Sequence, residues 1–300
     1  MRGSGDGNGA DDAAYVIRSR FVAPPEELEG CFTSFYRLEL DVEGDGRLRD
    51  YLQPEWGNIR FFCGVAPWSR MAGRDPITDT NFTATGPSSH PTEFELGTVR
   101  MWGVGFLPLG WARYIDADAK ELSDTVWDGS RHPVFRKFAP LREVLCNPGA
   151  SLEEQFDALC AAMRRLGRRH RDEATIVNVH RALVDEDLGN VAELADRAEL
   201  TMRSLERICA RHFGFTPKLL MRRQRFMRSL TSFMLHKGSK WTDVIDEHYH
   251  DQAQFTREFR AFMGMSPSEY AAQDHPILSS FVEARARMWG SPAQTLDRPA

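Results

Sequence analysis

Apolar and polar residues alternate over much of the first half of the chain, a pattern that predicts half-buried β-strands. In segment 32–42 the parity expected to face a core contains Phe32, Ser34, Tyr36, Leu38, Leu40 and Val42. Similar short runs, separated by loops with Pro and Gly, predict strands at Ile59–Val65, Phe94–Leu96 and Val99–Phe106. Segments 108–115 and 117–124 are expected to be helical. We therefore expect a β-rich domain, cupin-like or a sandwich, over residues 15–147.

After Asn147-Pro148-Gly149 the apolar residues recur every three or four positions, which predicts helices. Ser151 can cap the first of them, and we assign residues 148–172 to a linker helix. Further helices are expected between residues 173 and 275: Asn190–Ala198, Thr201–Phe213 before Gly214, one from Thr216-Pro217 to Gly238, and one after Ser266-Pro267. Residues 276–300 are expected to form a C-terminal helix and tail. The predicted fold class is α+β, with an all-α domain following the β-rich one.

An internal repeat with an offset of 50 residues lies within the helical half. Leu205-Glu206-Arg207 aligns with Phe255-Thr256-Arg257, and Gly214 aligns with Gly264. Each copy pairs a short helix with a second one: Asn190–Ala198 with Thr201–Phe213, and Trp241–Glu247 with Gln252–Met263. Such pairs are typical of helix-turn-helix motifs, whose second helix enters the major groove of DNA.

The exposed faces of the two second helices carry residue types that read base edges. If Leu205 and Cys209 face the core, polar residues three and four positions apart share the opposite side. Arginine suits guanine, glutamate accepts from cytosine, and glutamine suits adenine. The candidate base-reading residues are Arg203, Glu206, Arg207, Gln252, Gln254, Thr256 and Arg257. The alternative is that they are only solvated polar positions on two packed helices.

Charge distinguishes this half of the chain from the rest. The net charge is −5, yet the segment Arg197–Lys240 holds eleven basic and two acidic residues, a local balance of +9 that leaves −14 elsewhere. A basic segment within an acidic protein is the pattern expected of a module that meets phosphates. A solvated helix surface is the alternative when charge is considered alone.

The segment from about Ile176 to Tyr270 resembles the DNA-binding domain of AraC/XylS-type transcriptional regulators. The matching runs are Val191-Ala192-Glu193-Leu194-Ala195, Phe213-Gly214-Phe215-Thr216-Pro217, Arg222-Arg223-Gln224-Arg225-Phe226, and Phe255-Thr256-Arg257 with Gly264-x-Ser266-Pro267. The resemblance covers about a third of the chain and implies two helix-turn-helix motifs joined by a long helix, which read successive major grooves of double-stranded DNA. We expect contacts to phosphate, or support of the helices, from Thr201, Arg222, Arg223 and Ser266.

The turn before the second recognition helix departs from the family pattern, because His248-Tyr249 stands where Gly-Phe or Gly-Tyr is usual. The second motif is therefore a candidate for altered docking. His248 and His250 have no third ligand type close by in sequence, so we expect no metal site. A turn that titrates against phosphate is the alternative. His212 lies on the apolar face and is interpreted as a core histidine, and no cofactor is expected.

The N-terminal half contains no P-loop, G-x-G-x-x-G, G-x-S-x-G or metal-binding cupin spacing, so no enzymatic activity is expected. The run Gly103–Trp111 resembles the central motif of β-rich sensor-like domains that precede some AraC-type modules. A small apolar effector could bind among five tryptophans, although core packing is the alternative for each. These are Trp56, Trp68, Trp102, Trp111 and Trp127.

Composition indicates where the protein is located and in which state its cysteines are. No apolar stretch is long enough for a membrane helix, and the polar leader 1–14, expected to be disordered, contains no secretory signal, so a cytoplasmic location is expected. The five cysteines follow no short spacing and are interpreted as reduced, mostly buried thiols: Cys31, Cys63, Cys146, Cys160 and Cys209.

The combined prediction is a transcription regulator that binds DNA sequence-specifically and is controlled through its N-terminal domain. RNA polymerase, a small-molecule effector and a second copy in a homodimer are further candidate partners. One alternative is a ligand-binding or enzymatic β domain, which turnover of a metabolite by residues 1–150 would support. The other is a helical module that binds a protein, which salt dependence distinguishes from DNA binding.

Overall fold

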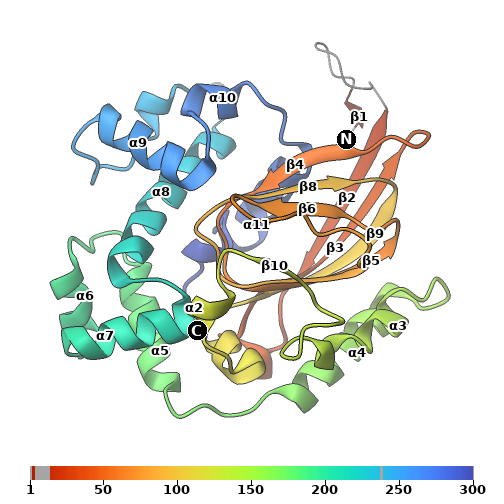
Figure 1. Ribbon diagram of the computed structural model, residues 1–300, viewed down its shortest axis with the longest axis horizontal. Helices are drawn as coiled ribbons and strands as arrows, with labels where there is room; N and C mark the ends of the chain where they lie inside the picture. Colours follow the sequence, from red (N-terminus) through yellow and green to blue (C-terminus); the bar gives the residue numbers. More distant parts are fainter. Residues whose placement is uncertain (1, 4–13, 237–238, 300) are drawn as a thin grey trace.

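The structure, a computed structural model, describes residues 2–3, 14–236 and 239–299. It confirms the α+β class, because sheets form the N-terminal part and helices the C-terminal part beside them (Figure 1). No helix in these ranges is long and apolar enough to cross a bilayer. Most of the expected leader, residues 4–13, lies outside the described residues, whereas Arg2–Gly3 form strand β1 against β2.

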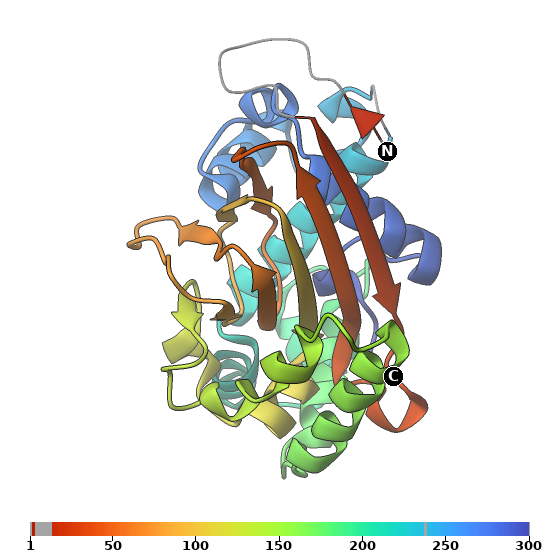
Figure 2. The same cartoon turned by 90° about the vertical axis from the view of Figure 1, so that its right-hand side faces the viewer.

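Two antiparallel sheets make up the N-terminal part. The larger has seven strands in the order β1-β2-β3-β9-β5-β7-β10, and its long strands β2, β3 and β9 lie side by side in Figure 2. The smaller has the order β4-β8-β6. The predicted strands are confirmed within a few residues. The bounds are β1 Arg2–Gly3, β2 Tyr15–Val22, β3 Phe32–Val42, β4 Leu48–Leu52, β5 Asn58–Gly64, β6 Trp68–Met71, β7 Phe82–Thr85, β8 Thr92–Leu96, β9 Val99–Phe106 and β10 Val126–Asp128.

Strand β3 shows how the two faces of the large sheet are covered. Leu38 and Leu40 belong to a core cluster shared with the small sheet. Phe35 faces the opposite way and packs against Phe156 of helix α4, with 6.0 Å between the ring centroids. Residues 32–35 are therefore buried on both faces, and the predicted alternation of buried and more exposed positions begins only beyond Tyr36.

Helix α4 (Leu152–Leu166), expected as a linker, packs on the large sheet. Its start is the predicted one, because Ser151 Oγ accepts the Glu154 N–H at 3.2 Å and the Glu154 carboxylate accepts the Ser151 N–H. Trp102 of β9 donates from Nε1 to Oε1 of Gln155 at 2.8 Å. Leu159 is fully buried. The helix is thus part of the core that also contains the sheet.

The segment between β9 and α4 contains short helical turns. Helix α1 (Pro108–Gly110) continues as the π-helical turn η2 (Trp111–Ile115), as the pattern predicted. The helix expected over 117–124 is shorter, because only α2 (Ala119–Leu122) forms. Asp116 and Asp124 have φ of +52° and +50°, left-handed conformations that cannot continue a helix. The remaining short elements are η1 (Glu26–Leu28), η3 (Arg136–Phe138) and α3 (Leu141–Leu145).

The C-terminal part is helical, and its predicted caps are confirmed. Asn190, Thr201, Thr216 and Ser266 each accept a backbone N–H at the start of a helix. Gly238 lies outside the described residues. The bounds are α5 Glu173–Leu183, α6 Val191–Arg197, α7 Met202–Ile208 with the π-helical turn η4 Cys209–Phe213, α8 Pro217–Leu235, η5 Trp241–Asp243, α9 Gln252–Met263, α10 Pro267–Ala271, α11 Pro276–Trp289 and η6 Gln294–Leu296.

The last helix, α11, returns to the N-terminal sheets. Its Phe281 packs edge-on against Phe21 of β2 at 5.3 Å between centroids. Oδ2 of Asp50, on β4, accepts the backbone N–H groups of Ile277 and Leu278 at 2.9 Å each. Asp50 is only 1% exposed. A buried carboxylate of the N-terminal part therefore caps the C-terminal helix.

The tail after α11 bonds to both parts of the chain. Asn58 of β5 donates to Oε1 of Gln294 at 3.0 Å, and Gln224 of α8 donates to the backbone oxygen of Thr295 at 2.5 Å. Arg285 of α11 is buried and donates to Ser34 of β3. These contacts fix the end of the chain between the sheets and the helical part.

The expectation of five reduced thiols is wrong for two of the cysteines. Cys63, at the end of β5, and Cys146, directly after α3, form a disulfide. The three others, Cys31, Cys160 and Cys209, are free and buried as expected. The bonded pair is 83 residues apart in sequence, so only the packing of α3 beside β5 brings it together.

We predict that Asp50→Ala lowers the free energy of unfolding by about 2 kcal/mol, because two amide donors lose their acceptor inside the protein. Urea unfolding followed by tryptophan fluorescence measures the change. The matched control is Asp45→Ala in the exposed turn before β4, which should stay within about 0.5 kcal/mol of the unmodified protein. Equal stability of the two variants would contradict the role of Asp50.

Candidate nucleic-acid interface

The first two-helix motif forms as predicted. Asn190 Oδ1 accepts the Glu193 N–H at 3.0 Å and starts α6. After a turn at Glu199, whose φ is +56°, Thr201 Oγ1 accepts the Ser204 N–H at 3.3 Å and starts α7. The Thr201 hydroxyl is therefore used as a helix cap, which fits the support role expected of it.

Helix α7 presents the expected polar face to solvent. Leu205, on the opposite face, is fully buried in the main core cluster. Arg203, Glu206 and Arg207 are all exposed. The structure thus brings the three candidate readers of the first motif together on one accessible helix face.

The second motif differs from the prediction at its first helix. Instead of a helix over Trp241–Glu247, the structure has a single 3₁₀ turn, η5. The chain then turns toward α8: the Asp246 N–H donates to Ser229 Oγ at 2.8 Å, and the Asp246 carboxylate pairs with Arg228 at 2.5 Å. The Asp246 N–H is therefore bonded to a side chain of α8 and not to the backbone oxygen four residues earlier, as a helix would require.

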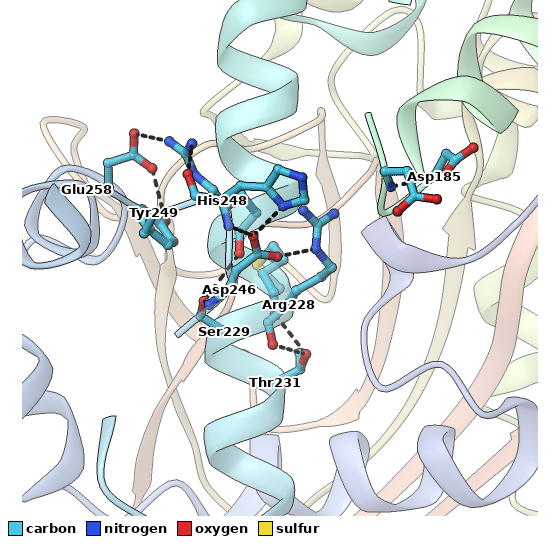
Figure 3. Close-up of polar contacts among 11 residues, drawn as sticks. Asp185, Arg228, Ser229, Thr231, Asp246, His248, Tyr249 and Glu258 are labelled. Atoms are coloured by element: carbon cyan, nitrogen blue, oxygen red, sulfur yellow. Dashed lines mark hydrogen bonds and ion pairs between the residues drawn. The ribbon is translucent and has the colours of Figure 1, made fainter. Parts of the chain in front are cut away.

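The unusual His248-Tyr249 turn is the link between α8 and α9 (Figure 3). The guanidinium of Arg225 stacks over the Tyr249 ring at 4.3 Å and donates to Oε1 of Glu258, on α9, at 2.8 Å. The Tyr249 hydroxyl donates to Oε2 of the same carboxylate at 3.0 Å. Burial and the nearby Glu258 carboxylate raise the pKa of Tyr249, so the hydroxyl remains a donor. His248 is held beside it through Nδ1 and Asp246 Oδ1, 3.0 Å apart.

Sequence reasoning missed this network. It singled out His248-Tyr249 as a departure from the family pattern but did not connect the turn with Glu258. The available signal was Glu258 itself, a carboxylate three residues after Phe255 and four before Phe262, which places it on the apolar face of α9. Burial of that residue became visible only in three dimensions, since it is 6% exposed.

Helix α9 starts one residue after Asp251, whose Oδ1 accepts the Gln254 N–H at 2.6 Å. Gln252 and Arg257 are exposed, and Thr256 is partly exposed. The side chain of Gln254 accepts the His250 N–H at 3.0 Å, so it stabilises the turn in this structure. Three of the four candidate readers in the second motif are therefore accessible without rearrangement.

Arg222 and Arg223 have different positions despite being neighbours. Arg222 pairs with Glu258 at 2.9 Å and remains partly exposed. Arg223 is 0% exposed, donates to the backbone oxygen of Ser88 at 2.9 Å and stacks over Trp56 at 4.0 Å. A phosphate contact by Arg223 is excluded in this arrangement, and the alternative role in packing of the long helix is the one observed.

The basic segment Arg197–Lys240 is not one continuous positive surface. Among the basic residues of this segment that the structure describes, five are buried or paired with carboxylates: Arg197, Arg222, Arg223, Arg225 and Arg228. Arg203, Arg207 and Lys218 are exposed. A groove of about 540 Å³ lies between the two motifs, bordered by α6, α8, His248 and α9. Lys218 and three partly exposed arginines of α8 line it, together with Glu258, the carboxylate that pairs with two of those arginines.

Three of the five tryptophans of the N-terminal part are buried in the core. Trp56, Trp102 and Trp111 are at most 2% exposed and belong to the main core cluster. A cavity inside the sheets, bordered by Arg60, Phe62 and Phe281 among others, has a volume of about 30 Å³. That volume is about the share of one water molecule. Core packing is the observed role of the three buried tryptophans.

Comparisons with known proteins found one family model and several solved structures. Residues 194–273 match the family model of a helix-turn-helix domain. ToxT from Vibrio cholerae is a similar solved structure, with 11% identity and a TM-score of 0.43 over 86% of this chain and 97% of that chain. A structure of ToxT with a bound unsaturated fatty acid has 12% identity and a TM-score of 0.41 over 88% of this chain and 96% of that chain.

The AraC-like transcriptional activator CuxR gives 13% identity and a TM-score of 0.28 over 71% of this chain and 86% of that chain. No curated protein matches the sequence. The family match spans α7, α8 and α9, the three helices on which the candidate interface is built. Residues 194–273 are therefore similar to a helix-turn-helix domain, the arrangement that the capped helices of the two motifs indicate.

Proposed function

We propose that the protein reads two successive major grooves on one side of double-stranded DNA. The observation that carries the proposal is the placement of two capped helices, α7 and α9, at opposite ends of α8 (Figure 1). Each presents an arginine from its exposed face: Arg207 from α7 and Arg257 from α9. Arginine recognises guanine through two parallel hydrogen bonds, so one base in each half-site would be guanine.

The groove between the two motifs supports the same arrangement. Two major grooves on one side of DNA are separated by a narrow minor groove and its phosphates. The positive lining beside α8 lies where such phosphates would pass, with Lys218 exposed and Arg222 partly exposed. We assign Arg222 and Lys218 to phosphate contacts and Ser266, which caps α10, to support of the second motif.

We further propose that the N-terminal part controls DNA binding by setting the position of α8. Arg223 lies within α8 and is inserted between Trp56 and Ser88 of the N-terminal part. A shift of the N-terminal loops would therefore move α8 and change the separation of the recognition helices. The protein acts in this scheme through binding alone, without a catalytic step.

The experiment that tests the proposal is selection from a randomised duplex pool by the full chain, followed by affinity measurements at two salt concentrations. The expected result is a bipartite motif with half-sites roughly 10 base pairs apart and an affinity that falls steeply with salt. Enrichment of a single half-site would contradict reading by α9. Salt-independent binding, or no enrichment, would contradict the proposed interface.

We predict that Arg207→Ala weakens binding to the selected site by about 1–3 kcal/mol and relaxes specificity at one base of the first half-site. Arg257→Ala should do the same in the second half-site only. Fluorescence anisotropy with duplexes altered at single positions measures both effects. The matched control is Arg131→Ala, an exposed arginine in the loop after β10, which should bind like the unmodified protein. Loss of affinity without a change in base preference would mean that these arginines contact phosphate.

We predict that Tyr249→Phe weakens binding to the bipartite site by about fivefold, the equivalent of one lost hydrogen bond near 1 kcal/mol. The physical reason is that Glu258 loses one of the donors that hold α9 on α8. Binding to a duplex with only the first half-site should be unchanged, which serves as the internal control. Equal weakening on both duplexes would show that the Tyr249 hydroxyl has no specific role in positioning α9.

A further inference from the structure

Four side chains of the types that bind metal ions lie close together in the structure. They come from the N-terminal part, from the segment before α5 and from the end of the first recognition helix. His170 and Asp172 lie between α4 and α5, and His212 lies in η4. One potential ligand atom from each of these three residues falls within 4.8 Å of the others. Asp116, directly after η2, adds a carboxylate 3.7 Å from Nε2 of His170.

The cluster is compact but loosely bonded internally. Nε2 of His212 is 3.4 Å from Oδ2 of Asp172, which is long for a charge-assisted hydrogen bond. The rings of His170 and His212 meet edge to face, with centroids 4.9 Å apart. Nδ1 of His170 accepts the backbone N–H of Asp172 at 3.1 Å. A cation bound through His170 would replace either this contact or the longer one between Nε2 and Asp116.

The donor types select the class of ion. Two imidazoles with one or two carboxylates suit zinc and other first-row divalent ions, whereas calcium and magnesium prefer oxygen ligands alone. His212 and His170 are largely shielded, with side chains 3% and 11% exposed, while Asp116 is 66% exposed and provides an entry side from solvent. Arg171, the nearest cation to Asp172 at 3.9 Å, is 78% exposed and can turn away.

We propose that His170, Asp172 and His212 form a binding site for a divalent transition-metal ion such as zinc, with Asp116 as a fourth ligand. The site joins three segments of the chain: the residue after η2, the residues before α5, and η4. Phe213 follows His212 directly and packs on Trp56 at 5.7 Å between centroids. An ion held by His212 therefore fixes η4, and with it α7, against the N-terminal part.

The experiment is a titration of the full-length protein, freed of metal by chelation, with Zn²⁺ alone in an isothermal calorimeter. The expected result is one equivalent bound, with at least a tenfold loss of affinity in His212→Ala and in Asp172→Asn. Thermal unfolding without zinc shows whether each variant is folded, and His170→Ala serves as a second histidine variant if His212→Ala is not. Zinc should raise the midpoint temperature of thermal unfolding of the unmodified protein but not that of the folded variants.

The matched control is His90→Ala, which removes another histidine next to an aspartate, Asp124 at 3.5 Å, without touching the proposed site. It should bind zinc like the unmodified protein. Absence of stoichiometric binding, or unchanged affinity in the folded cluster variants, would overturn the proposal.

A second measurement concerns the effect of the ion on DNA, and this part alone depends on the proposed function. Because the ion fixes α7, zinc should raise affinity for a duplex containing the first half-site, and His212→Ala should abolish the increase. Zinc binding without any effect on DNA would confirm the site and reject the coupling. Failure of DNA binding altogether would leave the calorimetric result unaffected.

Discussion

The position of α8 depends on a guanidinium that has no access to water. Arg223 is inserted between Trp56 and the backbone of Ser88, and Nε and Nη2 of its side chain have no hydrogen-bond partner within the described residues. A buried charge with incomplete hydrogen bonding is costly, so its retention needs a compensating interaction, here the stacking on Trp56. The cost of burying the Arg223 charge and the gain from its stacking on Trp56 therefore nearly offset each other. Helix α8, which carries Arg223, has a candidate recognition helix at each end. Under the proposed control, a change in the surroundings of Arg223 would move both of these helices.

Local signals in the sequence were sufficient for the helices and their order. Each helix cap depends on residues only a few positions away in sequence, and the structure confirms the caps at Asn190, Thr201, Thr216 and Ser266. The repeat offset of 50 residues is also visible in the sequence without knowledge of the fold. The helix predicted over Trp241–Glu247 failed because Asp246 is drawn to Arg228 and Ser229. The spacing of apolar residues along the chain cannot reveal such competition between a local helix and a partner that is distant in sequence.

The predictions that depended on tertiary packing were the ones the sequence could not make. Arg222 and Arg223 are identical in type and adjacent, yet one faces a groove and the other is buried, because successive helix positions point in different directions. Local charge counts likewise overestimate the free positive charge, since the partners Glu258 and Asp246 lie outside the basic segment. The candidate readers on α7 followed from helix geometry alone, but Gln254 was drawn into a turn that geometry did not predict.

The return of α11 to the sheets has a consequence for how the protein is made. The core cluster that contains Leu38 and Leu40 also contains Ile277 and Phe281, more than two hundred residues later in the chain. During synthesis the two sheets can pack against each other early, but the part of their core that Ile277 and Phe281 cover stays exposed until α11 has left the ribosome. Contacts of such large sequence separation slow the final folding step. Packing of this core cluster is therefore completed only after α11 has been synthesised.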